Sequence, residues 1–142
     1  MQEINVKPLS ENFQTPNYAT LGSSGADLYA ITDLILYMGE INLVSLGFAL
    51  ELPQGLEAQI RPRSSAAKNG ILIPNSPATI DSDYRGDVKV LMLNVQEKPY
   101  YVHVGDKIAQ MVIKPVHQVE FNVVEKINET LRSDGGFGST GR

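Results

Sequence analysis

The sequence predicts a single all-β domain, a sandwich or barrel of short strands, and three observations support this. Aliphatic and β-branched runs with partial two-residue alternation recur along the 142 residues. Turn-forming stretches at 52–55 (LPQG), 97–100 (EKPY) and 103–106 (HVGD) separate these runs at a spacing typical of all-β folds. No window of a dozen residues has the 3.6-residue apolar period of an amphipathic helix. A chain of this length can bury one core without disulfides or metals.

Strands are expected in five stretches, which are, in chain order, 43–52, 56–62, 86–95, 106–116 and 117–126. Each is rich in the β-branched and aliphatic side chains that suit the half-buried surface of a sheet. In the polar stretch 75–87, a strand conformation would place Asp81 and Asp83 on the same face.

One short helix is predicted within 63–70 (RSSAAKNG). Ser64 or Ser65 can serve as the N-cap, the residues 66–68 are good helix formers, and Gly70 suits the C-terminal cap. The length of this segment allows one or two turns.

The chain closes on RSDGGFGSTGR, residues 132–142. Glycines with Ser139 and Thr140 resemble a loop that wraps phosphate with backbone N–H groups, but no lysine and helix follow, as they do in the usual phosphate loop. Phe137 is almost the only apolar residue here. We therefore expect a domain at 1–132 and a mobile glycine-rich arm at 133–142.

Composition excludes several classes of function. The chain has no cysteine, which removes disulfides, thiolate nucleophiles and cysteine metal sites. The net charge of −4 argues against nonspecific nucleic-acid binding. No signal-peptide pattern and no stretch apolar enough to cross a membrane is present, so we expect a cytoplasmic protein without membrane partners. No serine lies in a G-x-S-x-G motif, which disfavours a covalent hydrolase.

Several polar residues have both a chemical and a structural interpretation. Asp81 and Asp83 could form a metal site or a general base with a supporting charge, or simply end a polar hairpin. Arg63 and the two serines after it could bind an anion or only cap a helix. Gln110 could satisfy a neighbouring backbone group, and Asp27 could be a turn residue.

Five stretches in this order resemble the trimeric dUTP pyrophosphatase (dUTPase) family. They cover nearly the whole chain, and they are SGADLYA (24–30), RPRSSAAKNG (61–70), NSPATIDSDYRGD (75–87), GDKIAQMVI (105–113) and RSDGGFGSTG (132–141). The resemblance implies a distorted β jelly roll, a homotrimer with active sites at subunit interfaces, and Mg²⁺-dependent hydrolysis of dUTP to dUMP and pyrophosphate. That reaction keeps uracil out of DNA and supplies dUMP for thymidylate synthesis.

The resemblance also implies a role for individual residues. Asp81 matches the carboxylate that activates the attacking water, and Asp27 matches an acidic residue near the water shell of the metal. The positions that match nucleotide contacts are Arg63, Ser64, the N–H of Ser65 and Gln110 for phosphate, Asn75 for uracil and Tyr84 for deoxyribose. In the arm, Arg132 matches a γ-phosphate ligand, Phe137 the ring that stacks on uracil, and Gly138, Ser139 and Thr140 further substrate contacts.

Two positions depart from the pattern common in the family, which often has glycine where Ala78 and Ser65 stand. Neither is the proposed base. Two other functions remain open. A dCTP deaminase-like enzyme would release ammonia instead of pyrophosphate, and a silent nucleotide-binding module would release neither.

Overall fold

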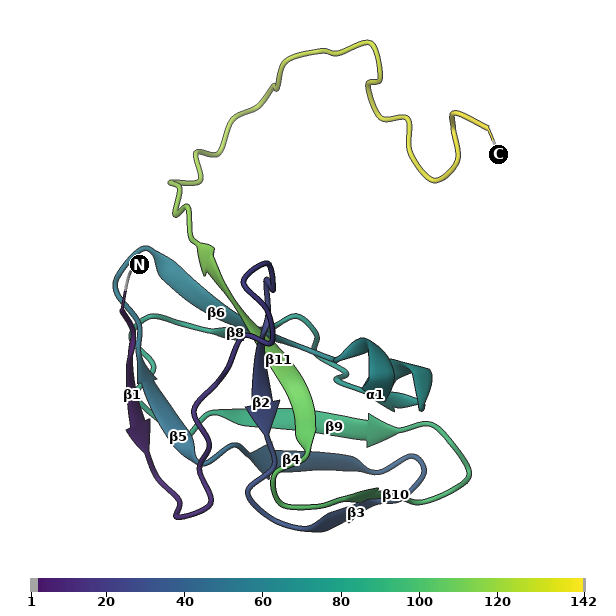
Figure 1. Ribbon diagram of the computed structural model, residues 1–142. Coiled ribbons are helices and arrows are strands. Elements are labelled where there is room, and N and C mark those ends of the chain that lie inside the picture. The colour runs from purple at the N-terminus through teal and green to yellow at the C-terminus, as the bar shows by residue number, and fades with distance from the viewer. Residues whose placement is uncertain (1–2, 142) are drawn as a thin grey trace.

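The computed structural model describes residues 3–141 and consists of short strands, one short helix and a long extended segment (Figure 1). The elements are, in chain order, β1 (Asn5–Pro8), β2 (Ala26–Tyr29), β3 (Leu34–Leu36), β4 (Ile41–Ser45), β5 (Phe48–Glu51), β6 (Leu56–Arg61), α1 (Ser64–Lys68), β7 (Ile71–Leu72), β8 (Ala78–Ile80), β9 (Lys89–Asn94), β10 (Tyr100–Val102) and β11 (Lys107–Pro115). The predicted all-β class with one short helix is therefore confirmed.

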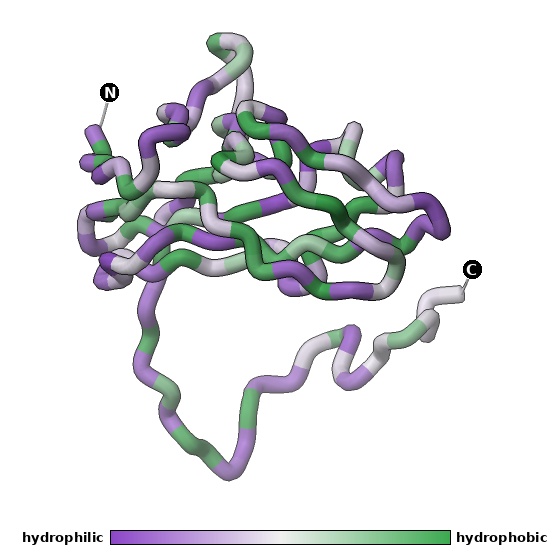
Figure 2. Tube along the Cα trace, turned by 90° about the horizontal axis from the view of Figure 1, so that it is seen from below, coloured by the Kyte–Doolittle hydropathy of each residue, from purple (hydrophilic) through white to green (hydrophobic). Residues whose placement is uncertain are grey.

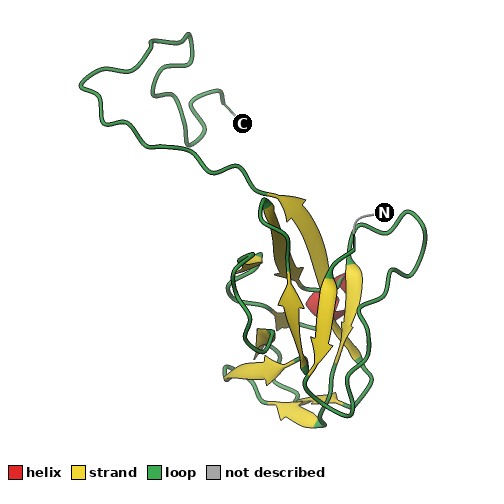
Figure 3. Ribbon diagram, turned by 90° about the vertical axis from the view of Figure 1, so that its left-hand side faces the viewer, coloured by secondary structure: helices red, strands yellow, loops and turns green. Residues whose placement is uncertain are grey.

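The strands form four antiparallel sheets and, within the described chain, do not close into a barrel (Figure 3). The largest sheet has the order β2-β11-β6-β8, and a second has the order β4-β9-β7. Two smaller pairs, β1–β5 and β3–β10, complete the body. This arrangement is jelly-roll-like, as the resemblance implied.

The core lies between the inner faces of these sheets, where the buried apolar residues form one cluster. Its largest fully buried side chains include Leu28 and Ile60 of the four-stranded sheet, Val90 and Met92 of β9, and Phe48 of β5. Each contributes about 1.5–3 kcal/mol relative to an exposed position. Alternation along β9, where Val90 and Met92 are buried and Leu91 and Leu93 are only partly buried, confirms the two-residue period expected for 86–95.

The expected strand at 43–52 is divided into β4 and β5 by a turn at Leu46 and Gly47. Gly47 has a φ of +74°, a conformation that side chains rarely adopt, and a Cβ there would crowd Ile31 and Ser10. The strand conformation expected for Asp81 and Asp83 is wrong, because β8 ends at Ile80 and the chain then turns, with the N–H of Tyr84 donating to the carbonyl of Asp81 at 3.2 Å.

The strand predicted at 117–126 is not formed. Within the described chain, the last backbone hydrogen bond to the body is donated by Val116 to Gly55 at 2.9 Å, and the segment then leads away from the body in every view (Figures 1 and 3). Its apolar side chains remain exposed, Val119 at 66%, Phe121 at 91% and Val123 at 97%. A strand needs a neighbouring backbone for its hydrogen bonds, and none of the described strands pairs with this segment. We call residues 116–141 the C-terminal segment (Figure 2).

Candidate functional site

The outer face of the four-stranded sheet carries a row of polar side chains. Strand register pairs Asp27 of β2 with Gln110 of β11, and Gln110 in turn with Arg61 of β6. Paired residues of an antiparallel sheet present their side chains on the same face. The row continues along β6, where Arg61 donates to Gln59 at 2.5 Å and Gln59 donates to Glu57 at 2.7 Å.

Asp27 is the charged residue buried at the end of this row, with its side chain only 10% exposed. One carboxylate oxygen, Oδ1, lies 3.0 Å from Nε of Arg63, and the other, Oδ2, lies 2.8 Å from Nζ of Lys107. The backbone of Asp27 is held by reciprocal hydrogen bonds with Asn17, at 2.8 and 3.3 Å. A buried charge is tolerated when it is paired in this way.

Arg63 is the N-cap of α1, which corrects the expectation that Ser64 or Ser65 would occupy that position. No side chain caps the helix, so first-turn N–H groups, including that of Ser65, are free to meet an anion. Asn69 is the C-cap, and the expected Gly70 is the residue that follows it, in a left-handed conformation with a φ of +71°. Ser64 and Ser65 are both exposed.

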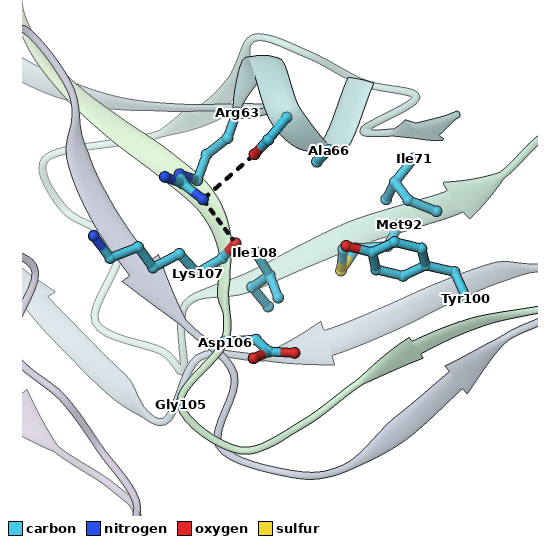
Figure 4. Close-up of a pocket in the computed structure, with 10 residues that line it drawn as sticks. Arg63, Ala66, Ile71, Met92, Tyr100, Gly105, Asp106, Lys107 and Ile108 are labelled. Atoms are coloured by element: carbon cyan, nitrogen blue, oxygen red, sulfur yellow. Dashed lines mark hydrogen bonds between the residues drawn. The ribbon is translucent and has the colours of Figure 1, made fainter. Parts of the chain in front are cut away.

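Arg63, Ser65 and Lys107 line one end of a cavity of about 400 Å³, whose remaining lining is mostly apolar but includes the carboxylate of Asp106 (Figure 4). The Arg63 guanidinium lies at the edge of this cavity and makes long contacts to the Ser65 hydroxyl, at 3.5 Å, and to the carbonyl of Lys107, at 3.4 Å. Arg63 and Lys107 therefore lie at this cavity, paired with the carboxylate of Asp27, and Arg61 lies nearby at the end of β6, where its side chain donates to Gln59. We call Arg61, Arg63 and Lys107 the cationic cluster. This arrangement suits an anionic ligand.

Gln110 is positioned by a hydrogen bond and by a close approach. Its Nε2 donates to the carbonyl of Pro62 at 2.9 Å, which places it between the Asp27 strand and the Arg63 helix. A Cβ at position 25 would overlap its carboxamide, so Gly25 makes room for it. Gln110 therefore hydrogen-bonds a neighbouring backbone carbonyl and also lies beside the candidate phosphate site.

The second group of site residues lies in the turn that follows β8. Asp81 is exposed and, together with Asp83 and Arg85, lines a cavity of about 850 Å³. Tyr84 folds its ring over Gly86, where a Cβ would overlap the ring, and its hydroxyl donates to the carbonyl of Asp87 at 2.9 Å.

Asn75, before β8, is exposed, and Tyr84 is 44% exposed. We call residues 75–87 the acidic hairpin for its tight turn and because its carboxylates outnumber its one arginine; its strand β8 pairs with β6, whereas β9 belongs to another sheet.

One copy of the chain does not bring the acidic hairpin to the cationic cluster. Ile80 pairs with Ala58 of β6, and Asp81 continues in the direction away from Arg63. At a rise of about 3.3 Å per residue, Arg63 and Asp81 are about 20 Å apart along the strands. The two cavities that these residues line have no residue in common.

The residues predicted in the tail do not meet either group. Nε of Arg132 donates to the carbonyl of Gly135 at 2.8 Å within the same tail. The Phe137 side chain is fully exposed, and its backbone φ is 50°. Gly138, Ser139 and Thr140 lie in turns whose backbone hydrogen bonds are local, such as Ser139 to Gly136 at 3.1 Å.

Lys107 is the residue that sequence reasoning missed. In the stretch GDKIAQMVI only Gln110 is a site candidate by sequence, because a lysine at the start of a strand is normally exposed to solvent. Its pairing with Asp27 depends on the register of β2 and β11, which no local pattern encodes.

Among residues 3–141, no group of three His, Asp or Glu side chains could hold a metal ion. The part of the chain that the structure describes also contains no helix long and apolar enough to cross a membrane.

The sequence of this chain is similar to those of known proteins over nearly its full length. The family model for dUTPase matches residues 11–141. The chain is 51% identical to the deoxyuridine 5'-triphosphate nucleotidohydrolase of Hydrogenobaculum sp. over 138 residues, 96% of each protein. It is 47% identical to the protein of the same name from Wolbachia pipientis, over 99% of this chain and 96% of the relative.

Solved structures agree on the fold. The G164S mutant of a Staphylococcus bacteriophage 80alpha dUTPase with dUpNHpp superimposes with a TM-score of 0.89 at 21% identity over the whole of both chains. A mutant dUTPase of phage phi11 of S. aureus, described for its structural Mg(II) ion, gives a TM-score of 0.81 at 22% identity over 88% of this chain and 98% of that one. From the family match over nearly its full length and the identity to these relatives, the chain belongs to the dUTPase family.

Proposed function

We propose that this chain hydrolyses dUTP to dUMP and pyrophosphate, with water attacking the α-phosphorus. The observation that carries the proposal is the presence of two complementary half-sites on one dUTPase-family chain, a cationic cluster that suits a polyphosphate and a hairpin with an exposed carboxylate. The relatives described above are named for this activity.

Phosphate binding is assigned to the cationic cluster. Arg63, with the hydroxyl of Ser64, the N–H of Ser65 and the carboxamide of Gln110, supplies donors on adjoining elements. Phosphoryl transfer depends mainly on positioning and on neutralising charge, and such donors do both.

Activation of water is assigned to Asp81. Water is a weak nucleophile, and a fixed carboxylate that accepts its proton contributes about 10²–10⁴-fold to the rate. Asp81 is exposed at the rim of the hairpin, so an incoming water and phosphate can reach it. The same exposed position would also suit a purely structural turn residue. Mutagenesis of Asp81 distinguishes the two roles, because only loss of a general base would reduce turnover.

Recognition of the nucleoside is assigned to the hairpin and the tail. Asn75 is proposed to contact uracil, and the Tyr84 ring to pack on deoxyribose, where it leaves little room for a 2′-hydroxyl. Phe137 would cover the base, while Arg132, Gly138, Ser139 and Thr140 would contact phosphate and complete the enclosure.

The implied Mg²⁺ fits an ion that arrives with the nucleotide. The described residues offer no cage of their own, and Mg²⁺ commonly keeps several waters and binds substrate phosphates. When bound, it would neutralise part of the triphosphate charge. Both oxygens of Asp27 already face cations, so its contact with the ion is proposed to run through water.

A homotrimer with sites at subunit interfaces explains why the two half-sites lie so far apart. An acidic hairpin on one copy is complementary in charge to the cationic cluster on the next. Such a contact joins two different surfaces, and repetition of a contact of this kind closes into a ring when the rotation allows.

The C-terminal segment is proposed to reach a neighbouring subunit and bring residues 133–142 over its site as a mobile arm. Val119, Phe121 and Val123 are exposed in the described part of the chain, and contact with a second copy would bury them. The substrate belongs to the intracellular nucleotide pool, so a cytoplasmic location is part of the proposal.

Pyrophosphate release tests the function directly. With Mg²⁺, the purified chain is expected to release pyrophosphate from dUTP, with kcat/KM at least about tenfold higher than for dTTP, since one methyl group is worth about 1–3 kcal/mol. UTP is expected to be rejected at the sugar. Removal of the metal with a chelator is expected to abolish most turnover.

Comparable kcat/KM for dUTP, dTTP and UTP would contradict the specificity assignment. Ammonia released from dCTP would instead identify a deaminase, and tight dUTP binding without turnover would identify a silent binding module.

Subunit mixing tests the shared site. Arg63→Ala and Asp81→Asn variants are each expected to be inactive, but a mixture refolded from denaturant should regain activity, because a site can then combine Arg63 of one subunit with Asp81 of another. Random assembly would leave about a quarter of the sites intact. If both residues served the same site from one chain, the mixture would stay as inactive as its components.

A further inference from the structure

We propose that Lys107 is a positioning residue of the phosphate site, which acts by holding Asp27 so that Asp27 can hold Arg63. The inference rests on the proposed function for its catalytic readout and concerns a residue to which the family resemblance described above assigned no role. Its basis is the ion-pair triad of Arg63, Asp27 and Lys107, drawn from three separate elements of the fold.

Asp27 is the centre of this triad because it cannot move freely. Its side chain is 10% exposed, and its backbone is fixed on one side by Asn17 and on the other by the register with Gln110 of β11. A carboxylate fixed in this way imposes its orientation on the groups that bind it.

Each oxygen of this carboxylate has a separate cation. Arg63 uses Nε for Oδ1, at 3.0 Å, and its Nη1 makes long contacts with the Ser65 hydroxyl, at 3.5 Å, and the Lys107 carbonyl, at 3.4 Å, at the edge of the cavity that all three residues line (Figure 4). Oδ2 is buried and, in the described chain, has no hydrogen-bond donor besides the ion-pair contact with Nζ of Lys107 at 2.8 Å.

Loss of Lys107 would leave Oδ2 as an unpaired buried anion. The nearest remaining cation is Arg63, and a carboxylate without its second partner would draw the guanidinium toward both oxygens and away from the cavity. The triad with Lys107 carries one net positive charge, whereas Asp27 with Arg63 alone is neutral. The lysine therefore sets the orientation of Arg63 and, through it, the affinity for a polyphosphate.

The test compares Lys107→Met with two matched variants. Lys107→Arg keeps a cation in reach of Oδ2, and Lys89→Met removes an exposed lysine that also begins a strand but lies on the other sheet. Binding is measured by calorimetry with inorganic tripolyphosphate, a probe that does not depend on activity, and KM and kcat are measured with dUTP.

Lys107→Met is expected to weaken tripolyphosphate binding and raise KM by at least about tenfold, the effect of losing one charge-assisted contact. The value of kcat should change much less, since Asp81 is untouched. Lys107→Arg should recover most of the affinity, and Lys89→Met should match the wild type. Thermal unfolding of all variants identifies any loss that comes from misfolding.

A double-mutant cycle with Asp27→Asn separates an indirect role from a direct one. If Lys107 acts through Asp27, Lys107→Met should add less than about twofold in the Asp27→Asn background. Fully additive effects would show a direct phosphate contact and overturn the positioning role, and so would a Lys107→Met variant that matches Lys89→Met.

These outcomes are distinct from failure of the proposed function. A chain whose tripolyphosphate binding depends on Lys107 by way of Asp27, but that does not hydrolyse dUTP, would overturn the proposed function and keep the inference. An active chain that is indifferent to Lys107 would do the reverse.

Discussion

Replacing Asp81 by asparagine is expected to reduce kcat for dUTP by about 10²–10⁴-fold, the usual contribution of a general base. Asparagine keeps the size and polarity of the side chain but cannot accept the proton of the attacking water. Asp81 is exposed on a turn, and none of the hydrogen bonds described above uses its carboxylate, so the fold should be unaffected. Steady-state pyrophosphate release measures the change in turnover.

Binding should survive this substitution. Calorimetry with dUpNHpp, the analogue present in the phage 80alpha structure, is expected to give a Kd within about threefold of the wild type, because the cationic cluster is intact. Asp83→Asn is the matched control, since Asp83 is exposed and lines the same cavity. An equal loss of kcat in both variants would mean that the charge of the hairpin matters rather than a specific base. A near wild-type kcat in Asp81→Asn would overturn the assignment of Asp81 as the general base.

Deleting residues 133–142 is expected to lower kcat/KM for dUTP by about 10²-fold or more. Stacking of one base on an aromatic ring is worth about 1–3 kcal/mol, and each hydrogen bond to a charged group about 1.5–3 kcal/mol. Part of this is offset by the entropy lost when a glycine-rich segment becomes ordered. The deletion removes Phe137, Ser139 and Thr140 together.

The same deletion should leave the fold and the oligomer intact. Hydrogen bonds of the described tail are local, and the Phe137 side chain is fully exposed. Circular dichroism, thermal unfolding and light scattering should therefore match the full chain. Phe137→Tyr should retain the stacking that Phe137→Ala loses. A truncated chain with full activity would show that the tail does not close over the site.

Local sequence was enough for the elements whose own residues define them. The helix at α1 follows from good helix formers and a glycine in a left-handed conformation, and the alternation in β9 follows from which side chains suit a core. The segment 117–126 was mispredicted because its pattern describes a strand, while strand formation requires a second backbone that this chain does not place beside it.

The chain by itself determined the class of fold, the family and the chemical types of the two half-sites, because these depend on residue identity and order. Tertiary structure decided which charges meet. Asp27, Arg63 and Lys107 come from β2, the start of α1 and β11, and only the register of the sheet places both cations on one buried carboxylate. The same register separates Asp81 from Arg63 along β6 and β8, because strand length fixes distance in a way that spacing in sequence does not.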